Sequence, residues 1–150
     1  MSLPTVLESI EDANNEADIK TFRFANIKEF NSFMDSFNFD EYPINIVVPF
    51  EDNGTWSEGR IKAIIPIQGW VLTRLSDDTD IRSKQAEEHY IAPMRDKAKK
   101  FMFEIINSEL TDPEVTAVTY NIRPEYAFLN QMAFGVSYRM NWPISTKFPC

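Results

Sequence analysis

Cysteine and histidine are almost missing from this sequence. Of the 150 residues one is a cysteine, Cys150, and one is a histidine, His89. A disulfide within the chain needs two cysteines, and a thiolate or imidazole metal site needs several such ligands, so the sequence excludes both. The run Glu87–His89 also differs from the helical zinc-protease motif, which requires two histidines four residues apart. We therefore expect neither a metal site nor a cofactor.

Glycine is also scarce, and the four glycines are scattered. The chain contains no glycine-rich phosphate loop and no serine in a Gly-x-Ser-x-Gly turn. Carboxylate pairs remain as candidates for acid–base chemistry or for binding a hard cation; they lie at Glu51–Asp52, Asp77–Asp80 and Glu87–Glu88. Helix capping by Asp77–Asp80 and solvation of Glu51–Asp52 are simpler accounts. We expect no catalytic residues. A small hydrolase that uses one of these carboxylate pairs remains an alternative function.

Long apolar runs are absent as well. The longest uncharged stretches, Ala63–Thr73 and Tyr126–Tyr138, are shorter than the roughly 20 residues that a membrane helix requires. The first residues lack the basic start and apolar stretch of a secretory signal. We expect a protein without a membrane partner, held in a cytoplasm-like compartment or carried within a particle that is assembled there.

The composition suits one globular domain with an uneven distribution of charge. Hydrophobic residues make up 43%, aromatic residues 13% and charged residues 25%, which is ordinary for a folded protein. The net charge is −8, and the first sixty residues, with twelve acidic and four basic side chains, account for all of it. This balance argues against a protein that coats DNA. The acidic segment is either a solvated surface or a surface that repels an anion or attracts a basic partner.

Helices are predicted from the spacing of apolar residues. Residues 3–14 carry apolar side chains at helical spacing, and Asn26 suits the start of a second, short helix. A long helical stretch follows the acidic turn Ser76–Asp80 and runs to Ser108, with a break near Pro93. Beyond that break apolar residues recur along one side, opposite a row of basic residues; they are Met94, Ala98, Phe101, Met102, Ile105 and Ile106. We expect this side to lie on a sheet.

Strands are predicted where β-branched or alternating residues cluster: Thr21–Ala25, Ile44–Val48, Ile61–Leu75, Val115–Ile122 and Gln131–Asn141. The second and third form a long hairpin, for which Asn53–Gly54 supplies the turn signal. Pro66 has no N–H to donate, so it predicts a sheet edge or a bulge. Pro124 is expected to end the fourth strand. The last strand alternates cleanly, which predicts one buried face and one face of small or polar residues.

The order of these elements predicts an α+β fold, because strands come in neighbouring pairs instead of alternating with helices. We expect an antiparallel or mixed sheet with a long hairpin and with helices packed on one face. Residues 1–142 are predicted to form this single domain. Residues 143–150, which include Pro143 and Pro149, are predicted to form an extended C-terminal arm.

The layout of residues 1–142 resembles the tail-terminator and tail-completion proteins of tailed bacteriophages. An N-terminal helix precedes paired strands, a long hairpin follows, a long helix crosses the sheet and two strands close it. The segments Tyr42–Val48 and Phe134–Pro143 are similar to strands of such proteins. The richness in Asn and Ile is similar to phages of Bacteroidetes hosts, including crAss-like phages. The family has no catalytic residues that could be carried over to this chain.

This resemblance implies a non-enzymatic virion protein that forms a ring, a hexamer or a higher multiple, at the head–tail junction. Its partners would be further copies of itself and the neighbouring neck, portal-adaptor or tail proteins. DNA would pass through the ring without sequence-specific binding, and the acidic segment would line the channel. Another ring or tube position in the virion belongs to the same class of function.

Five residues are candidates for contacts between subunits: Asn53, Trp56, Asp77, Asp78 and Trp142. Trp56 lies in the predicted hairpin loop, where a large aromatic side chain either folds back onto its own sheet or inserts into a neighbour. The alternative to a ring subunit is a monomeric acidic binding module, or adaptor, that docks a basic protein partner.

Overall fold

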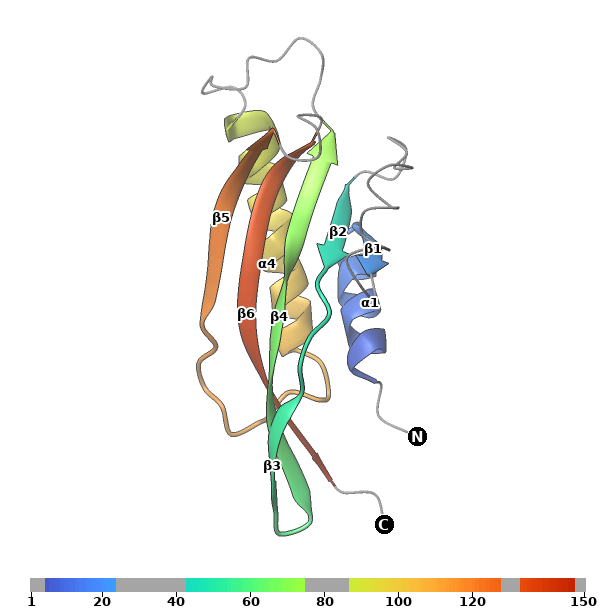
Figure 1. Ribbon diagram of the computed structural model, residues 1–150, viewed down its shortest axis with the longest axis vertical. Helices are drawn as coiled ribbons and strands as arrows, with labels where there is room; N and C mark the ends of the chain where they lie inside the picture. Colours follow the sequence, from blue (N-terminus) through green and yellow to red (C-terminus); the bar gives the residue numbers. More distant parts are fainter. Residues whose placement is uncertain (1–4, 24–42, 75–86, 128–132, 148–150) are drawn as a thin grey trace.

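A computed structural model describes residues 5–23, 43–74, 87–127 and 133–147, and Figure 1 shows their arrangement. Within these ranges the chain forms one mixed sheet with two α-helices on one side of it. The predicted α+β class is thereby confirmed, as are the mixed sheet and the packing of the helices on one face. The predicted helix at Asn26 and the acidic turn at Ser76–Asp80 lie outside the described residues.

The sheet has the strand order β1-β2-β4-β6-β5. Strand β3 pairs with the N-terminal part of β4, Arg60–Ile64. Only the contact between β1 and β2 is parallel; the other pairs are antiparallel. The strands are β1 (Lys20–Arg23), β2 (Ile44–Val47), β3 (Asn53–Ser57), β4 (Arg60–Arg74), β5 (Tyr120–Ala127) and β6 (Ala133–Lys147). The two long central strands, β4 and β6, pair over their whole length and form the frame of the molecule.

The helices are α1 (Val6–Glu16) and α4 (Ala92–Ile106), the latter preceded by a π-helical turn, η2 (Glu87–Ile91). The side chain of Thr5 caps α1 by accepting the backbone N–H of Glu8 at 3.1 Å. Pro93 lies in the first turn of α4, where a missing N–H costs no helical hydrogen bond. The predicted break near Pro93 is therefore confirmed as a change of helix type.

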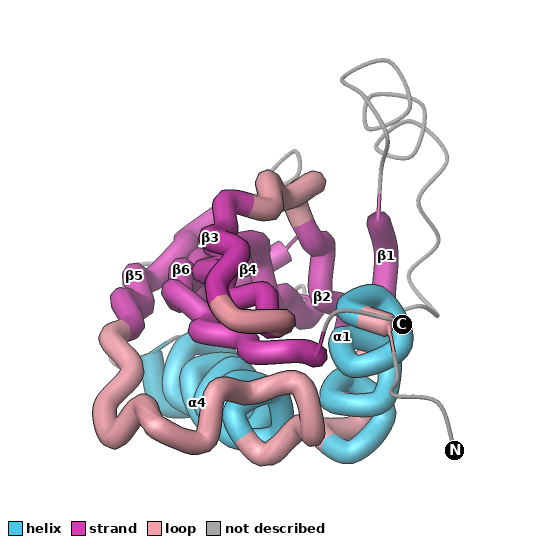
Figure 2. The backbone as a smooth tube through the Cα atoms, turned by 90° about the horizontal axis from the view of Figure 1, so that it is seen from below, coloured by secondary structure: helices cyan, strands magenta, loops and turns pink. Residues whose placement is uncertain are grey.

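The main core lies between the helices and one face of the sheet, which we call the covered face (Figure 2). Alternate residues of β4 and β6 point toward it, as the alternation in β6 predicted. The apolar side of α4 packs there as expected, and the inner side of α1 adds Ile10 and Ala13. The largest fully buried side chains of this core are Trp142, Phe101, Ile10, Ile65, Ile67, Ile91, Ile105 and Met140.

The other face of the sheet, here called the open face, carries the intervening residues of β4, β6 and β5. It is not uniformly exposed. Ile44, Ile46 and Leu72 are buried, and the pairing of β2 with β4 places them on this face at the β2 side. Toward β5 and toward the N-terminal end of β4, polar and half-buried residues take the place of these buried residues. The open face is therefore accessible mainly over β6, β5 and the hairpin.

The predicted hairpin exists, but its turn is elsewhere. Asn53–Gly54 lies inside strand β3, and the chain reverses at Glu58–Gly59. Glu58 has φ 49° and Gly59 φ 79°, so both central residues occupy the left-handed region that a tight hairpin turn requires. The prediction from Asn53–Gly54 was wrong. Both Asn53–Gly54 and Glu58–Gly59 can form such a turn, and only the pairing of the strands selects between them.

Pro66 lies at a gap between two strands, as its missing N–H predicted. Opposite it, Asn141 donates its backbone N–H to Thr119 on the β5 side, at 3.5 Å. The N–H and C=O of one residue in an antiparallel ladder point to the same side. Pro66 therefore directs its nitrogen away from β6, to the edge of β4 between the end of β2 and the start of β3.

Two predicted ends of strands were wrong. Strand β5 continues through Pro124, because this residue faces Val136 in a non-hydrogen-bonded pair and directs its nitrogen to the outer edge of β5. Strand β6 continues beyond Asn141 to Lys147, paired with β4 over Arg60–Ile65. Residues 143–147 are thus the end of a central strand instead of an extended arm. A proline is tolerated at such places because the ladder requires no donor from it.

Candidate functional site

The β3–β4 hairpin projects beyond the body of the sheet, away from the helices (Figure 1). Trp56 lies near its turn, opposite Ile61, and is 65% exposed. Asn53 is exposed at the base of the same hairpin, opposite Ile64, which is itself 55% exposed. Of the two alternatives for Trp56, folding back onto its own sheet is partial at most, because most of the indole remains in solvent. The hairpin therefore presents apolar surface where a neighbouring molecule can reach it.

Polar contacts of β4 anchor the hairpin to the body, at Lys62 midway along the hairpin and at Arg60 directly after its turn. Lys62 contacts the Glu114 carboxylate at 2.7 Å and the Asp112 carboxylate at 3.8 Å. The hydrogen bond to Glu114, with the charge of Asp112, raises the pKa of Lys62 above its ordinary value. Nearby, the Arg60 guanidinium donates to Ser145 Oγ at 2.9 Å and 3.1 Å. These contacts line a cavity of about 490 Å³ and hold the hairpin against the end of β6.

The remaining predicted interface residues do not join this surface. Trp142 is fully buried on the covered face, and its Nε1–H donates to Thr111 Oγ1 at 2.8 Å. Its assignment to an interface is wrong, because β6 continues past it and leaves none of the indole for a second molecule. Asp77 and Asp78 lie outside the described residues. Of the five candidates, Asn53 and Trp56 both lie on the hairpin, but on opposite faces of β3, because they are three residues apart.

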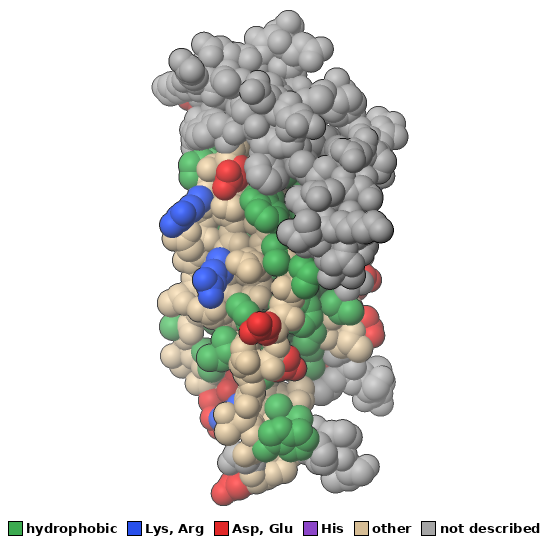
Figure 3. All heavy atoms as spheres, in the orientation of Figure 1, with side chains coloured by type: hydrophobic (Ala, Val, Ile, Leu, Met, Phe, Trp, Pro, Cys, Tyr) green, Lys and Arg blue, Asp and Glu red, His purple; other side chains and the backbone are tan. Residues whose placement is uncertain are grey.

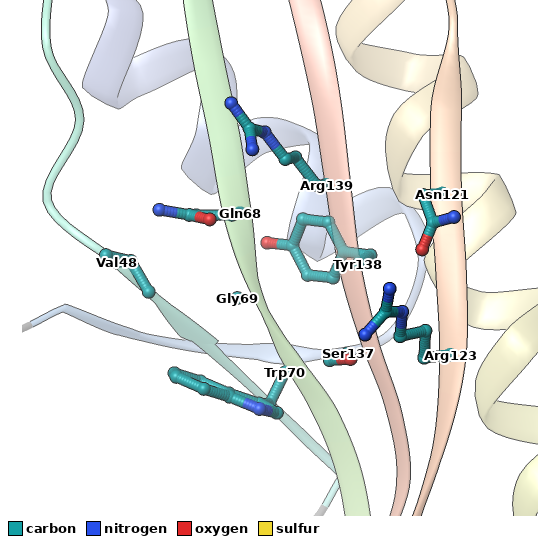
Figure 4. Close-up of a pocket in the computed structure, with 9 residues that line it drawn as sticks. All are labelled: Val48, Gln68, Gly69, Trp70, Asn121, Arg123, Ser137, Tyr138 and Arg139. Atoms are coloured by element: carbon teal, nitrogen blue, oxygen red, sulfur yellow. The ribbon is translucent and has the colours of Figure 1, made fainter.

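Sequence reasoning missed a groove on the open face, shown in Figure 4. It has a volume of about 420 Å³ and crosses β4, β6 and β5. Its polar side chains come from two neighbouring rows of the sheet, Gln68–Arg139–Asn121 and Trp70–Ser137–Arg123. Val48 and Trp70 add an apolar wall on the β4 side. We call this site the arginine groove.

The arginine groove carries two exposed guanidinium groups. Arg123 stands on β5 and Arg139 on β6. Figure 3 shows basic side chains on the part of the surface that these strands form. Glu125 lies on the same face of β5, one row further along. Among the residues that the structure describes, no ion pair of 4.0 Å or less involves Arg123 or Arg139. The two arginines are far apart in the sequence, so only the pairing of β5 with β6 brings them together.

A buried chain of polar groups lies under the groove, on the covered face. The Tyr138 hydroxyl donates to Asn45 Oδ1 at 2.9 Å, and Asn45 Nδ2 donates to Asn14 Oδ1 at 2.9 Å. Asn14 Nδ2 then donates to Thr21 Oγ1 at 2.7 Å. This chain connects β6, β2, α1 and β1. Burial raises the pKa of Tyr138 well above its usual range, and the hydrogen bond to Asn45 opposes the shift.

Gly69 makes this chain possible. It faces Tyr138 in the pairing of β4 with β6. A Cβ at this position would collide with the carbonyl oxygen of Ile46 and would lie 3.1 Å from the Tyr138 hydroxyl. The tyrosine therefore crosses β4 over a residue without a side chain and reaches β2. The role of Gly69 is this close approach.

Comparison with protein families and with curated proteins finds no match for the chain. In the part of the chain that the structure describes, no helix is long and apolar enough to cross a membrane. The same residues bring no three potential metal-ligating side chains together. The proposed function therefore depends on the geometry of the hairpin and of the arginine groove.

Proposed function

We propose that this protein is a non-enzymatic structural subunit of a tailed-phage virion. It forms an oligomeric ring at the head–tail junction, as a tail terminator or neck protein, and DNA passes through the ring. The observation that carries the proposal is the projecting β3–β4 hairpin with Trp56, an indole that is 65% exposed. An exposed tryptophan on a projecting element is typical of an anchor that is buried in a partner.

The anchoring of the hairpin supports the same proposal. A subunit contact gains affinity when the contacting element is already held in its bound position. The ion pairs of Lys62 and the hydrogen bonds of Arg60 hold the β4 side of the hairpin against the body of the molecule. The hairpin and the body surface that would receive it are different surfaces. Such a contact is head-to-tail, and it closes into a ring when its rotation allows.

Native mass spectrometry of the purified protein, alone and with candidate head or tail components, tests this proposal. We expect a closed-ring mass in one of these conditions and the loss of that mass for Trp56→Ala. Tyr120→Ala is the matched control, because Tyr120 is an exposed aromatic residue, 55% accessible, on β5. A folded Trp56→Ala protein that assembles like the wild type would remove Trp56 as the anchor. A strict monomer in every condition would contradict the ring.

The second candidate is a monomeric acidic binding module that docks a basic protein. The exposed side of α1 favours it, because Glu8, Glu11, Asp12 and Glu16 all lie there and the last turn contains no basic residue. Such a module would bind a basic peptide with an affinity that falls steeply as salt increases. A monomer with this salt-dependent binding would favour the module over the ring.

A further inference from the structure

We propose that the arginine groove of one copy of this chain binds the acidic side of α1 of the next copy. The inference deepens the proposed function, since it names a charged surface through which identical subunits would meet. It concerns a second contact, separate from the Trp56 hairpin. The proposed occupant of the groove is a second copy of this chain. The Glu8 and Asp12 carboxylates of that copy would bind Arg123 and Arg139 of the first.

The groove fits a carboxylate-bearing partner. Its two charged groups, Arg123 and Arg139, are both exposed guanidinium groups with donors suited to carboxylates. Gln68 and Asn121 flank Arg139 in its row, and Ser137 lies beside Arg123. These side chains provide additional neutral donors for carboxylate oxygens. Trp70 and Val48 close one side of the groove and reduce the access of water to the ion pairs.

The acidic side of α1 is shaped to supply these carboxylates. Glu8 and Asp12 are exposed and lie four residues apart, so they stand next to each other on one side of the helix. Like charges at this spacing repel each other and destabilise an isolated helix. A pair of cations brought by another molecule would remove this repulsion. Lys97 donates to the carbonyl of Ala17 at 3.1 Å, so it supplies positive charge only at the C-terminal end of α1.

The spacings of the two surfaces agree. Arg139 is one row away from the residue that faces Arg123, and such diagonal neighbours on adjacent strands are about 7–8 Å apart at Cα. Side chains one helical turn apart are about 5–6 Å apart at Cβ. Long arginine side chains accommodate the difference. One turn of α1 can therefore place one carboxylate on each guanidinium.

The two surfaces cannot meet within one copy. Helix α1 packs with α4 on the covered face, whereas the arginine groove opens on the opposite face over β5 and β6. Groove and helix are also different surfaces, so their contact is head-to-tail, and every bound copy presents a free groove or a free helix to the next. Such a contact closes into the ring that the proposed function requires when the rotation between neighbouring copies allows it.

Charge reversal tests the inference in the full chain. One variant carries Arg123→Glu and Arg139→Glu, and the other carries Glu8→Lys and Asp12→Lys. We expect either variant alone to lose self-association about 100-fold or more, because like charges then face each other. An equimolar mixture of the two is expected to regain it, since every contact again joins opposite charges. Circular dichroism and sedimentation equilibrium over a concentration series measure folding and association.

A matched control separates this contact from a general effect of charge. Asp96→Lys with Glu109→Lys changes the net charge of the protein by the same amount as the helix variant, at exposed carboxylates outside the proposed contact. We expect this control to associate like the wild type or more strongly. A reversal at α1 that has no larger effect than the control would overturn the inference.

The remaining outcomes distinguish the inference from the proposed function. A ring that forms equally well from the wild type and from both reversed variants would overturn the groove contact and leave the ring intact. A wild-type protein that stays monomeric up to about 1 mM, the concentration limit for a weak specific contact, would overturn the self-contact. Loss of association in both reversed variants and its recovery in their mixture support the inference, because only paired charges explain both results.

Discussion

The two faces of the sheet are built from the same strands and differ in what they bury. On the covered face, β4 and β6 contribute a continuous apolar layer that α1 and α4 close. On the open face, the same two strands contribute Gln68, Ser137, Arg139 and Asn141, which are exposed or half-buried. The covered face therefore provides most of the stability of the domain. Over β5 and β6 the open face is available for binding, because its side chains there are exposed or half-buried.

Removing Trp142 from the covered face gives the largest expected effect. Trp142→Ala should lower the free energy of unfolding by about 3–5 kcal/mol, since it creates a cavity in a closed core and leaves Thr111 without the indole donor. Trp56→Ala is the matched control, with an expected change within about 0.5 kcal/mol. Urea unfolding followed by circular dichroism measures both. Equal losses would break the distinction between core and projecting hairpin.

The polar chain of the covered face gives the next effect. Tyr138→Phe leaves Asn45 Oδ1 without its donor and should cost about 1–3 kcal/mol. Burial raises the pKa of Tyr138 above its ordinary value of 10.0. The folded state thus holds the proton after the unfolded state has released it. The stabilisation from the neutral form is complete below pH 10 and decreases above it, by about 1.4 kcal/mol per pH unit.

Unfolding titrations at pH 9, 10 and 11 check this dependence. The wild type should lose stability between pH 10 and pH 11, and Tyr138→Phe should show less of that loss, since phenylalanine has no proton to release. Tyr120→Phe is the control, because Tyr120 is exposed on β5. Parallel pH profiles for the wild type and Tyr138→Phe would show that the Tyr138 hydroxyl does not control stability in this range.

The open face gives the smallest expected effect on stability. Arg123→Gln combined with Arg139→Gln should change the free energy of unfolding by no more than about 0.5 kcal/mol, because both side chains are exposed. Ile67→Ala, on the covered face of β4, is the contrasting variant and should cost about 2–5 kcal/mol. Thermal unfolding of the two proteins provides the comparison. A large loss for the arginine pair would mean that the open face also supports the fold.

The regular periodicities of the sequence predicted much of the fold. The apolar spacing of residues 94–106 predicted the buried side of α4, and the alternation in residues 133–141 predicted which side of β6 faces the core. The prolines were harder to interpret. Pro66 indicated an edge correctly, but Pro124 and Pro143 lie within strands. Whether a proline interrupts a strand depends on the direction of its nitrogen in the ladder, and the pairing of strands decides that direction.

The candidate site was predictable only in part. An exposed aromatic residue in a polar segment singled out Trp56, and the structure places it on a projecting hairpin. The same reasoning failed for Trp142, because burial depends on how far β6 extends along β4. The arginine groove had no local signal at all. Arg123 and Arg139 are sixteen positions apart, and the register of β5 against β6 makes them neighbours.

The sequence alone determined the α+β class, the acidic first sixty residues and the apolar sides of α4 and β6, because these depend on composition and on short periodic spacing. The position of the hairpin turn, the burial of Trp142 and the existence of the arginine groove became visible only in the folded chain. Each of these depends on which residues of distant strands lie opposite one another. That register is set by packing across the whole sheet, and no local stretch of sequence contains it.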